Sequence, residues 1–420
     1  MNLKTLFFRL LPLAVTVCLP CLQVHAQPAA AATPRTAYID HLLEDFVDKG
    51  KIAGANVMVL QNGKPVYEKS FGWRDREGNR KMTPDTLFRI ASQTKAITSA
   101  AIMTLVEEGK VGINEPVGNF IPTFRKTTVA SLENNGIKFV DAKRPITVFD
   151  LLTHSAGISY GRETHIAALY EAKELGAKAG NGWYTADKTE PVCDTMETLG
   201  TIPFLRQPGE AYVYGYNTDI LGCIVEKASG MPLDQYIQKR ITGPLGMNDT
   251  YFYVPVGERE RLAAVYSTAT GTGKAERAPE GSRGQGHYVD GPRKSFAGGA
   301  GLISTARDYA RFLEMVRNGG IVDGVRVLSP RAVELMTTNQ IGALRGPQGL
   351  GFGLGFETVD RYGASGMASV GSFGWGGAYG TTYQVDRKAG LVTVLMLQMM
   401  PNGTDIQPKF YQTVYQAFGK

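Results

Sequence analysis

The two ends of this 420-residue chain carry β-rich patterns, whereas the long middle does not. Near the start, Ala53–Leu60 and Val66–Trp73 flank Asn62-Gly63, the dipeptide typical of a two-residue hairpin turn. Near the end, Thr381–Val385 and Leu391–Leu397 flank a second turn-like segment. We therefore expect one α/β domain whose sheet is built from both chain ends, with a helical middle.

Helices are expected beside the terminal strands and through the middle. The terminal helices would run from Tyr38 to Lys49 and from Pro408 to Phe418. Four further segments have helical spacing: Ser92–Gly109, Ile146–His154, Leu221–Ala228 and Ala306–Asn318. Val256–Phe296 is rich in Gly, Arg and Ser and shows no clear period, so we interpret it as long surface loops.

Composition limits the class of protein. The hydrophobic fraction of 43% and charged fraction of 20% are ordinary for a soluble chain with a sizeable core, which excludes wholly disordered, collagen-like and coiled-coil proteins. Glycine is high, at 50 of 420 residues. Gly349–Gly355 alternates glycine with apolar residues but lacks the spacing of a phosphate-binding loop. It predicts a strand that other backbone approaches closely.

The first 26 residues are typical of a secretory signal. Lys4 and Arg9 precede the short apolar run Leu10–Leu22, and Val24-His25-Ala26 has small residues where cleavage needs them. We expect cleavage after Ala26, an Ala/Pro-rich tether over residues 27–37, and a periplasmic or secreted protein. The run is shorter than the ~20 apolar residues of a membrane span. A retained membrane anchor is the alternative.

Charge and cysteine content point to no further partner. Losing two basic residues with the signal would lower the net charge from +6 to +4, and no Lys/Arg-rich run indicates nucleic-acid binding. Cys193 and Cys223 would remain; an oxidising compartment permits a bridge, but the apolar surroundings of Cys223 favour a buried free thiol. Two cysteines and one well-placed histidine make no metal site, so we expect neither metal nor cofactor.

Ser92-x-x-Lys95 stands at the start of a strongly helical run. Residues i and i+3 share a helix face, so the Lys95 amine can reach the Ser92 hydroxyl. Serine is a weak nucleophile until a neighbouring base takes its proton, and a helix N-terminus favours negative charge at the acyl centre. Taken alone, the motif also fits a serine at a helix start beside a solvated lysine.

Two aromatic motifs follow further along the chain. Tyr214 lies in the loop Tyr212–Asn217, where it could relay a proton between nucleophile and leaving group. Gly374–Tyr379 opens a strand whose glycines would let a substrate lie against bare backbone. Taken separately, each is equally compatible with an aromatic turn packed on the core.

In this order and spacing, Ser92-x-x-Lys95, Tyr214 and Trp375-Gly376-Gly377 resemble the three motifs of the serine β-lactamase and penicillin-recognising superfamily. The resemblance is closest to the family VIII carboxylesterases, which are related to class C β-lactamases. Further similar segments are Ile146–Gly157, Pro244–Met247 and Gly298–Phe312, so the resemblance covers most of the chain from about residue 40.

The resemblance implies a β-lactamase/DD-peptidase-like α/β fold, with an antiparallel sheet flanked by helices and a mostly helical lobe. We expect one catalytic unit over residues 38–420. Its α/β lobe would span about 38–90 and 298–420, its helical lobe about 91–255, and a loop-rich insertion about 256–297. The active site would lie between the two lobes.

The resemblance also implies roles for single residues. Ser92 would be the acylated nucleophile, and Lys95 and Tyr214 would share the general-base role, with Tyr214 returning the proton to the leaving group. The backbone N–H groups of Ser92 and Ala378 would form the oxyanion hole. Residues expected to bind substrate are Trp375, Gly376, Gly377 and Tyr216.

Two positions depart from the superfamily pattern. Tyr216 stands where its Tyr-x-Asn element has asparagine, and Asn217 follows one place late. Trp375 replaces the lysine of Lys-Thr-Gly, which in β-lactamases and peptidases helps to receive the substrate's carboxylate. Because tryptophan carries no charge, such a site should lose affinity for anionic β-lactams and suit neutral acyl groups. Both departures match the esterase branch, and weak β-lactam turnover stays compatible with them.

A rival nucleophile is Ser159, in a Gly-x-Ser-x-Gly sequence like the nucleophile elbow of α/β-hydrolases. That elbow needs a preceding strand and a later histidine, whereas the preceding segment looks helical and only His165 and His287 follow. The pattern therefore favours Ser92. His154, at the end of a family-like helix, is interpreted as structural.

The sequence thus predicts an exported serine hydrolase that cleaves small-molecule carboxylic esters through a Ser92 acyl-enzyme, with no stable membrane span after signal removal. A β-lactamase or D-alanyl peptidase/amidase of the same superfamily, or a non-catalytic penicillin-binding-type protein, is the alternative. Nothing in the sequence indicates an oligomeric state. The aromatic residues expected to wall the cleft are Tyr160, Trp183, Tyr184, Tyr214, Tyr216 and Trp375.

Overall fold

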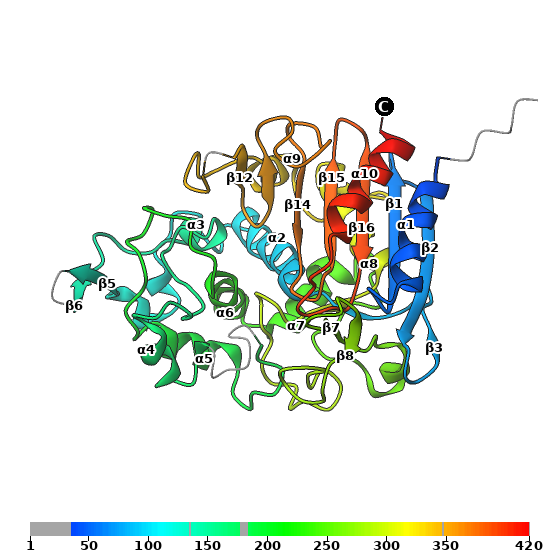
Figure 1. Cartoon of the computed structure of the whole chain (residues 1–420). Coiled ribbons are helices and arrows are strands. Elements are labelled where there is room, and N and C mark those ends of the chain that lie inside the picture. Colours follow the sequence, from blue (N-terminus) through cyan, green and yellow to red (C-terminus); the bar gives the residue numbers. More distant parts are fainter. Residues whose placement is uncertain (1–34, 134–135, 177–183, 347, 420) are drawn as a thin grey trace, which may run out of the picture. The chain divides into compact units, whose positions relative to one another are not determined.

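Figure 1 shows the computed structural model of the chain, which describes residues 35–133, 136–176, 184–346 and 348–419. Its main sheet has eight strands in the order β12-β13-β14-β15-β16-β1-β2-β3, and every neighbouring pair is antiparallel. The strands are β1 (Gly54–Gln61), β2 (Lys64–Asp75), β3 (Arg80–Lys81), β12 (Leu350–Phe352), β13 (Glu357–Val359), β14 (Phe373–Gly376), β15 (Thr382–Asp386) and β16 (Leu391–Met396).

The two chain ends meet where β1 pairs with β16, in a register that runs from Asn56 opposite Met396 to Gln61 opposite Leu391. This pairing confirms the expectation of one antiparallel sheet built from both ends. The predicted β1–β2 hairpin also forms. Asn62 and Gly63 have φ angles of 51° and 79°, the positive values that a type I′ turn requires at both central residues.

Helices cover both faces of this sheet, so its central strands are buried on both sides. Along β1, Met58 and Leu60 belong to one apolar core, while Val57 and Val59 belong to the other. This is the two-residue alternation of a strand. The second core is closed by α1 (Ala37–Asp48) and α10 (Ile406–Phe418), and the first by α8 (Ala306–Arg317), as Figure 1 shows.

The middle of the chain supplies the remaining helices, and α2 is the most deeply buried of them. Almost all of its residues are inaccessible to solvent, as expected for a helix that is apolar on every face. No helix in the described ranges is both long and apolar enough to cross a membrane. The helices are α2 (Thr94–Glu107), α3 (Val148–Leu152), α4 (Ala167–Glu171), α5 (Val192–Leu199), α6 (Asn217–Ser229), α7 (Leu233–Ile237) and α9 (Pro330–Thr337).

Short strand pairs and single turns complete the described part of the chain. The pairs are β4 (Phe88–Arg89) with β9 (Ile303–Ser304), β5 (Thr128–Glu133) with β6 (Gly136–Asp141), β7 (Tyr266–Thr268) with β8 (Ala275–Arg277), and β10 (Ile321–Val322) with β11 (Val325–Arg326). The short helical turns are Ala91–Gln93, Val117–Asn119, Pro122–Arg125, Gln238–Thr242 and Val256–Arg261.

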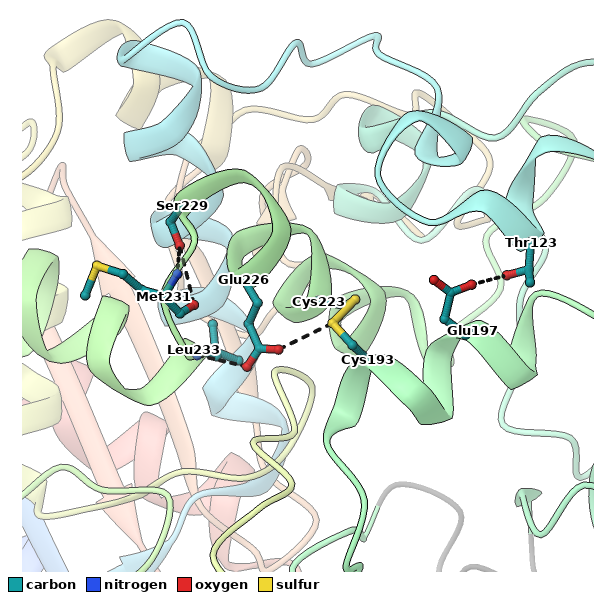
Figure 2. The surroundings of a disulfide bond; sticks show 8 residues. All are labelled: Thr123, Cys193, Glu197, Cys223, Glu226, Ser229, Met231 and Leu233. Atoms are coloured by element: carbon teal, nitrogen blue, oxygen red, sulfur yellow. Dashed lines mark hydrogen bonds between the residues drawn. A yellow bond between two sulfur atoms is a disulfide. The ribbon is translucent and has the colours of Figure 1, made fainter.

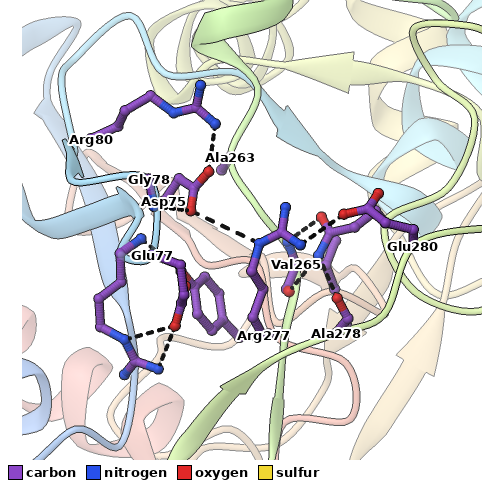
Figure 3. Close-up of polar contacts among 12 residues, drawn as sticks. Asp75, Glu77, Gly78, Arg80, Ala263, Val265, Arg277, Ala278 and Glu280 are labelled. Atoms are coloured by element: carbon purple, nitrogen blue, oxygen red, sulfur yellow. Dashed lines mark hydrogen bonds and ion pairs between the residues drawn. The ribbon is translucent and has the colours of Figure 1, made fainter.

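The segment interpreted as surface loops, Val256–Phe296, contains more structure than expected. It forms the β7–β8 hairpin, which polar contacts attach to the end of β2 (Figure 3). Arg277 of β8 lies between the buried carboxylate of Asp75, 3.9 Å away, and Glu280, 2.7 Å away. The hairpin is short and carries charged residues, one of which, Arg277, has a partner as distant in sequence as Asp75, so no strand pattern marks it.

The interpretation of Cys193 and Cys223 as free thiols is wrong. They form a disulfide that joins α5 to α6, with their Cα atoms 5.0 Å apart (Figure 2). The apolar surroundings of Cys223 were read correctly, because that residue is fully buried. The pairing depends on how two helices pack, which the local sequence does not contain.

The glycine-rich segment Gly349–Gly355 behaves as predicted. It contains β12, and other backbone lies against its glycines. A Cβ atom on Gly353 would lie 2.1 Å from the carbonyl oxygen of Met336, so no larger residue fits there. This confirms the close-approach interpretation over a phosphate-binding loop.

Candidate active site

Ser92 lies in the single helical turn that leads into α2. The residue before it, Ala91, has a φ angle of 42°, a left-handed conformation that is strained for a residue with a Cβ atom. Ser92 remains partly exposed at the surface of a large cavity, while α2 continues into the core behind it. A strained turn at the start of a buried helix therefore presents this hydroxyl to the cavity.

Lys95, one helical turn further on, lies under that hydroxyl and is only 1% exposed. Its Nζ atom contacts Ser92 Oγ at 3.3 Å, the Tyr160 hydroxyl at 3.2 Å and the carbonyl oxygen of Gly299 at 2.7 Å. A hydroxyl can donate or accept a hydrogen bond, so the contact with Ser92 persists whichever of the two groups holds the proton. The carbonyl can only accept, so it fixes one N–H direction.

Tyr214 lies in the loop before α6, and its ring is next to the Lys95 amine. The Lys95 Nζ atom is 4.6 Å from the centre of the Tyr214 ring. The Tyr214 hydroxyl accepts a hydrogen bond of 3.3 Å from the indole Nε1–H of Trp375. Because an indole nitrogen can only donate, this contact leaves the Tyr214 proton free to point elsewhere.

Trp375 is held in place from behind by a cation. The guanidinium carbon of Arg345 lies 5.1 Å from its ring centre, and Arg345 forms an ion pair with Glu357 of β13. Burial raises the pKa of Glu357, although Arg345 opposes that effect. The position that carries a lysine in the superfamily motif is therefore neutral here, with a paired charge behind it.

The oxyanion-hole candidates meet at a close backbone contact. A Cβ atom on Gly377 would lie 2.3 Å from the carbonyl oxygen of Ile90, two residues before Ser92. The next residue, Ala378, lines the cavity, and no acceptor among the described residues takes its backbone N–H. Gly377 therefore lets the segment that carries Ala378 lie directly beside the one that carries Ser92.

Ser92, Tyr214 and Trp375 line a cavity of about 660 Å³ between the sheet and the helical middle. Ser92, Tyr160 and Tyr214 form its helical side, while β13, β14 and β15 supply the other. Charged groups at its surface carry both signs, with Arg162 next to Glu163. The wall thus combines aromatic rings with hydrogen-bonding side chains: Trp375, Tyr383, Thr382, Gln384, Gln407 and Tyr411.

Two residues expected at the cavity lie elsewhere. Tyr216, expected to bind substrate, is 1% exposed, and its hydroxyl accepts the N–H of Gly176. Its ring packs behind Tyr160, with ring centres 4.9 Å apart. Tyr184 is also buried, and its hydroxyl accepts the N–H of His287. Sequence spacing does not determine which way a loop side chain turns; Trp183 lies outside the described residues.

The rival nucleophile and the histidine take structural positions. Ser159 is 1% exposed, donates to Glu163 at 2.7 Å and accepts the N–H of Gly161. His154 is buried, and its Nδ1 lies 2.9 Å from the amide nitrogen of Asn217. Burial, together with the positive charge of Lys95, lowers the pKa of His154 well below its usual value. Neither residue lines the cavity.

Known proteins are similar in sequence to this chain over most of its length. The family model described as Beta-lactamase matches residues 39–417. The chain belongs to the Beta-lactamase family. Two relatives in other organisms are the protein Rv1367c of Mycobacterium tuberculosis, 35% identical over 90% of this chain and 98% of its own length, and the esterase EstB of Burkholderia gladioli, 31% identical over 87% and 91%.

A solved structure of another protein shares the fold. It is that of EstCE1, described as a hydrolase with promiscuous acyltransferase activity, and it superposes with a TM-score of 0.77 at 24% identity. The match covers 91% of this chain and 98% of that one. This likeness confirms the β-lactamase-like fold expected from the sequence.

The sequence motifs of the family missed two groups around Lys95. The Tyr160 hydroxyl was expected only as part of the wall, yet it contacts the amine directly. Asp219 of α6 was not singled out; it is fully buried and accepts the N–H of Gly299 at 3.0 Å. Burial raises its pKa to about 6. The signal available in the sequence was the position of this acid, directly before the apolar run Ile220–Val225.

No group of three or more His, Cys, Asp or Glu side chains in the described ranges is arranged to hold a metal ion. The groups gathered here are a hydroxyl and an amine in contact, Ser92 and Lys95, with the Tyr214 ring beside the amine. Such a set can activate an oxygen nucleophile and pass its proton on.

Proposed function

We propose that this serine hydrolase cleaves carboxylic esters of small molecules through an acyl-enzyme on Ser92. The observation that carries the proposal is the contact between Ser92 Oγ and Lys95 Nζ at the surface of a large cavity, with Tyr214 beside them. The esterase among its relatives supports ester substrates. An alternative within the family, β-lactam or peptide cleavage, uses the same first step.

The chemistry would proceed in two halves. Ser92 Oγ bonds to the ester carbonyl carbon while its proton passes to Lys95, and the N–H groups of Ser92 and Ala378 stabilise the negative oxygen. The carbon–oxygen bond to the alcohol then breaks as Tyr214 hands a proton to the leaving oxygen, and Lys95 passes the proton it took from Ser92 on to Tyr214. Water repeats the attack on the acyl-enzyme, which releases the carboxylic acid and returns the proton to Ser92.

The neutral wall at Trp375 supports esters over anionic lactams. Tryptophan carries no charge, and its indole N–H is already bonded to Tyr214, so the side chain does not attract a substrate carboxylate. Glu357 and its partner Arg345 cancel each other behind it. Arg162 and Glu163, a cation and an anion, both lie at the cavity surface, so a β-lactam must be tested directly.

The test compares hydrolysis of p-nitrophenyl butyrate and of nitrocefin by the wild type, Ser92→Ala and Ser159→Ala. We expect the wild type and Ser159→Ala to cleave the ester and Ser92→Ala to lose activity by at least about 10⁴-fold, as nucleophile removal does in serine hydrolases. Full ester hydrolysis by Ser92→Ala would refute the site. Comparable nitrocefin turnover would favour the lactamase alternative. Labelling by a fluorescent penicillin without turnover of either substrate would favour a non-catalytic penicillin-binding protein.

We further propose that the protein is exported and that its signal is removed after Ala26. The Cys193–Cys223 disulfide supports an oxidising compartment, where such bridges form and persist. Expression in a bacterial host followed by intact-mass measurement of the periplasmic fraction tests this. A mature chain beginning at Gln27 is expected, and retention of the full-length chain in the membrane fraction would contradict it.

A further inference from the structure

Asp219 is a buried acid that the proposed chemistry does not use, and it lies next to the catalytic amine's support. Its Oδ1 atom accepts the N–H of Gly299 at 3.0 Å. The carbonyl of the same residue, Gly299, accepts from Lys95 Nζ at 2.7 Å. Its other oxygen, Oδ2, has no hydrogen-bond partner among the described residues. One residue therefore separates a buried carboxylate from a buried amine.

The orientation of Gly299 makes this contact electrostatically useful. Its N–H points toward the carboxylate and its C=O toward the amine, so both polar groups are aligned with the field between a negative Asp219 and a positive Lys95. Each charge would be costly to bury alone, because both side chains are removed from water. An ammonium formed on Lys95 is thus stabilised by a carbonyl and, behind it, by a carboxylate.

Glycine is required at position 299 for the arrangement to exist. A Cβ atom there would lie 2.5 Å from Oδ2 and 3.1 Å from Oδ1 of Asp219. The neighbouring Gly298 is equally constrained, since its Cβ atom would lie 2.6 Å from the carbonyl oxygen of Thr218. The segment therefore packs against the start of α6 with its backbone alone.

We propose that Asp219 is a positioning residue for Lys95: through Gly299 it orients the amine toward Ser92 and stabilises the ammonium that forms when Ser92 loses its proton. This inference rests on the proposed function. Its logic is that of a hydrolase triad, in which a third group orients and stabilises the base. Asp219 acts through the backbone N–H and C=O of Gly299 and touches neither substrate nor reacting atoms.

The proposal predicts a specific dependence on pH. The titratable groups that face Asp219 are Lys95 from α2, Tyr160 from the loop after α3 and Tyr216 from the loop before α6. Burial raises the pKa of Asp219 to about 6. Below that pH the carboxyl is neutral in the wild type, so an Asp219→Asn variant then resembles it; above that pH only the wild type carries the charge.

The experiment measures kcat and KM for p-nitrophenyl butyrate from pH 5 to pH 9 in the wild type and Asp219→Asn. We expect kcat of the variant to fall by about 10- to 100-fold at pH 8 with little change in KM, and the difference to shrink toward pH 5. Asparagine can still accept the Gly299 N–H, so a purely structural role predicts equal kcat at every pH. Equal kcat would overturn the proposal.

Two further variants separate charge from packing. Gly299→Ala keeps the carboxylate but displaces it, and should lower kcat in the same way. Asp234→Asn is the control, because burial also raises the pKa of Asp234 in α7 and one of its oxygens likewise has no hydrogen-bond partner among the described residues, yet it is only partly buried and makes no contact with Gly299. We expect its kcat to equal that of the wild type throughout.

Reaction of Ser92 with a fluorophosphonate distinguishes failure of this inference from failure of the proposed function. Ser92 Oγ bonds to phosphorus, fluoride leaves, and the serine proton passes to Lys95, so the labelling rate reports nucleophile activation without an ester. If the wild type cleaves no ester but Asp219→Asn slows labelling, the function fails and the positioning role stands. If the variant reacts with both the ester and the fluorophosphonate at wild-type rates at pH 8, the positioning role fails.

If the wild type reacts with neither reagent, a double-mutant cycle of Asp219→Asn and Lys95→Met in urea unfolding remains as a test. An interaction free energy of zero between the two changes would overturn the positioning role.

Discussion

At the scale of single residues, the site depends on backbone positions as much as on reactive groups. Ser92 is presented by a strained Ala91, Lys95 is held by the carbonyl of Gly299, and Ala378 is brought close by Gly377. In each case a conformation or contact that few residues tolerate sets the direction of a reactive atom. Strain of this kind persists where the surrounding structure fixes it, which is common at active sites.

Gly377→Ala should damage catalysis more than binding. The added Cβ atom would lie 2.3 Å from the Ile90 carbonyl oxygen, so the segments that carry Ser92 and Ala378 must separate. A displacement of about 1 Å in an oxyanion hole costs on the order of 100-fold in rate, so we expect kcat for p-nitrophenyl butyrate to fall by about that factor.

Gly376→Ala provides the comparison, because its Cβ atom would come no nearer than 3.1 Å to Thr381 and would meet nothing near Ser92. We expect a clearly smaller loss of kcat for this variant. Equal losses in the two variants would show that the Gly377–Ile90 contact does not set the oxyanion hole.

At the scale of elements, α6 links the site to the rest of the helical middle. It begins directly after the loop that carries Tyr214, and it holds Asp219 in its first turn and Cys223 further along. Near the disulfide, the Glu226 carboxylate accepts the N–H of Leu233 at the start of α7, and burial raises the pKa of Glu226 (Figure 2). One helix thus connects the groups proposed to transfer protons to a covalent crosslink.

Replacing both cysteines of that crosslink with serine should lower stability but not chemistry. The bridge closes a loop with a sequence separation of 30 residues, for which chain-entropy reasoning gives about 2–4 kcal/mol of stabilisation. We expect a lower Tm by differential scanning calorimetry and an unchanged kcat below the transition. Reductant should lower the Tm of the wild type but not that of the double variant; a wild-type Tm in the double variant would contradict the prediction.

The start of α3 should lose its stabilising carboxylate in acid. Asp150 is buried and accepts hydrogen bonds from both Nη atoms of Arg144, at 2.6 and 2.8 Å, and from the N–H of Thr147 at 2.8 Å. Burial alone would raise the pKa of Asp150, but these donors hold it below its ordinary value of 3.8. A lowered folded-state pKa contributes stability above the ordinary value, and that contribution is lost as pH falls through the folded value.

Asp150→Asn should therefore lower the free energy of unfolding by about 2 kcal/mol at pH 7, because the charge-assisted bonds weaken. The gap between variant and wild type should close as pH falls below the ordinary value of 3.8, as urea unfolding at pH 7, 5 and 3 would show. Asp45→Asn, at an exposed ion pair with Lys49, is the control and should change little at any pH. A gap that is constant with pH would rule out the carboxylate's charge as its cause.

At the scale of the whole molecule, the sequence predicted the parts that are local or repeated in pattern. The β1–β2 hairpin follows from an Asn-Gly turn between β-rich runs, and the encounter of Ser92 with Lys95 follows from their spacing on one helix. What it missed depends on packing between distant segments. The disulfide requires α5 against α6, and the inward turn of Tyr216 follows from its contact with Tyr160.

The β1–β16 pair at the centre of the sheet also sets the order of events during synthesis. Its two strands are 330 residues apart, from Gln61 to Leu391, so β1 leaves the ribosome on the order of 15–65 s before its partner. Throughout that interval the apolar residues of β1 lack the neighbours that β16 later provides, so we expect chaperones to bind them. Because the sheet can close only after β16 has been made, the chain can be kept unfolded until then. Passage through a membrane during the proposed export requires that unfolded state.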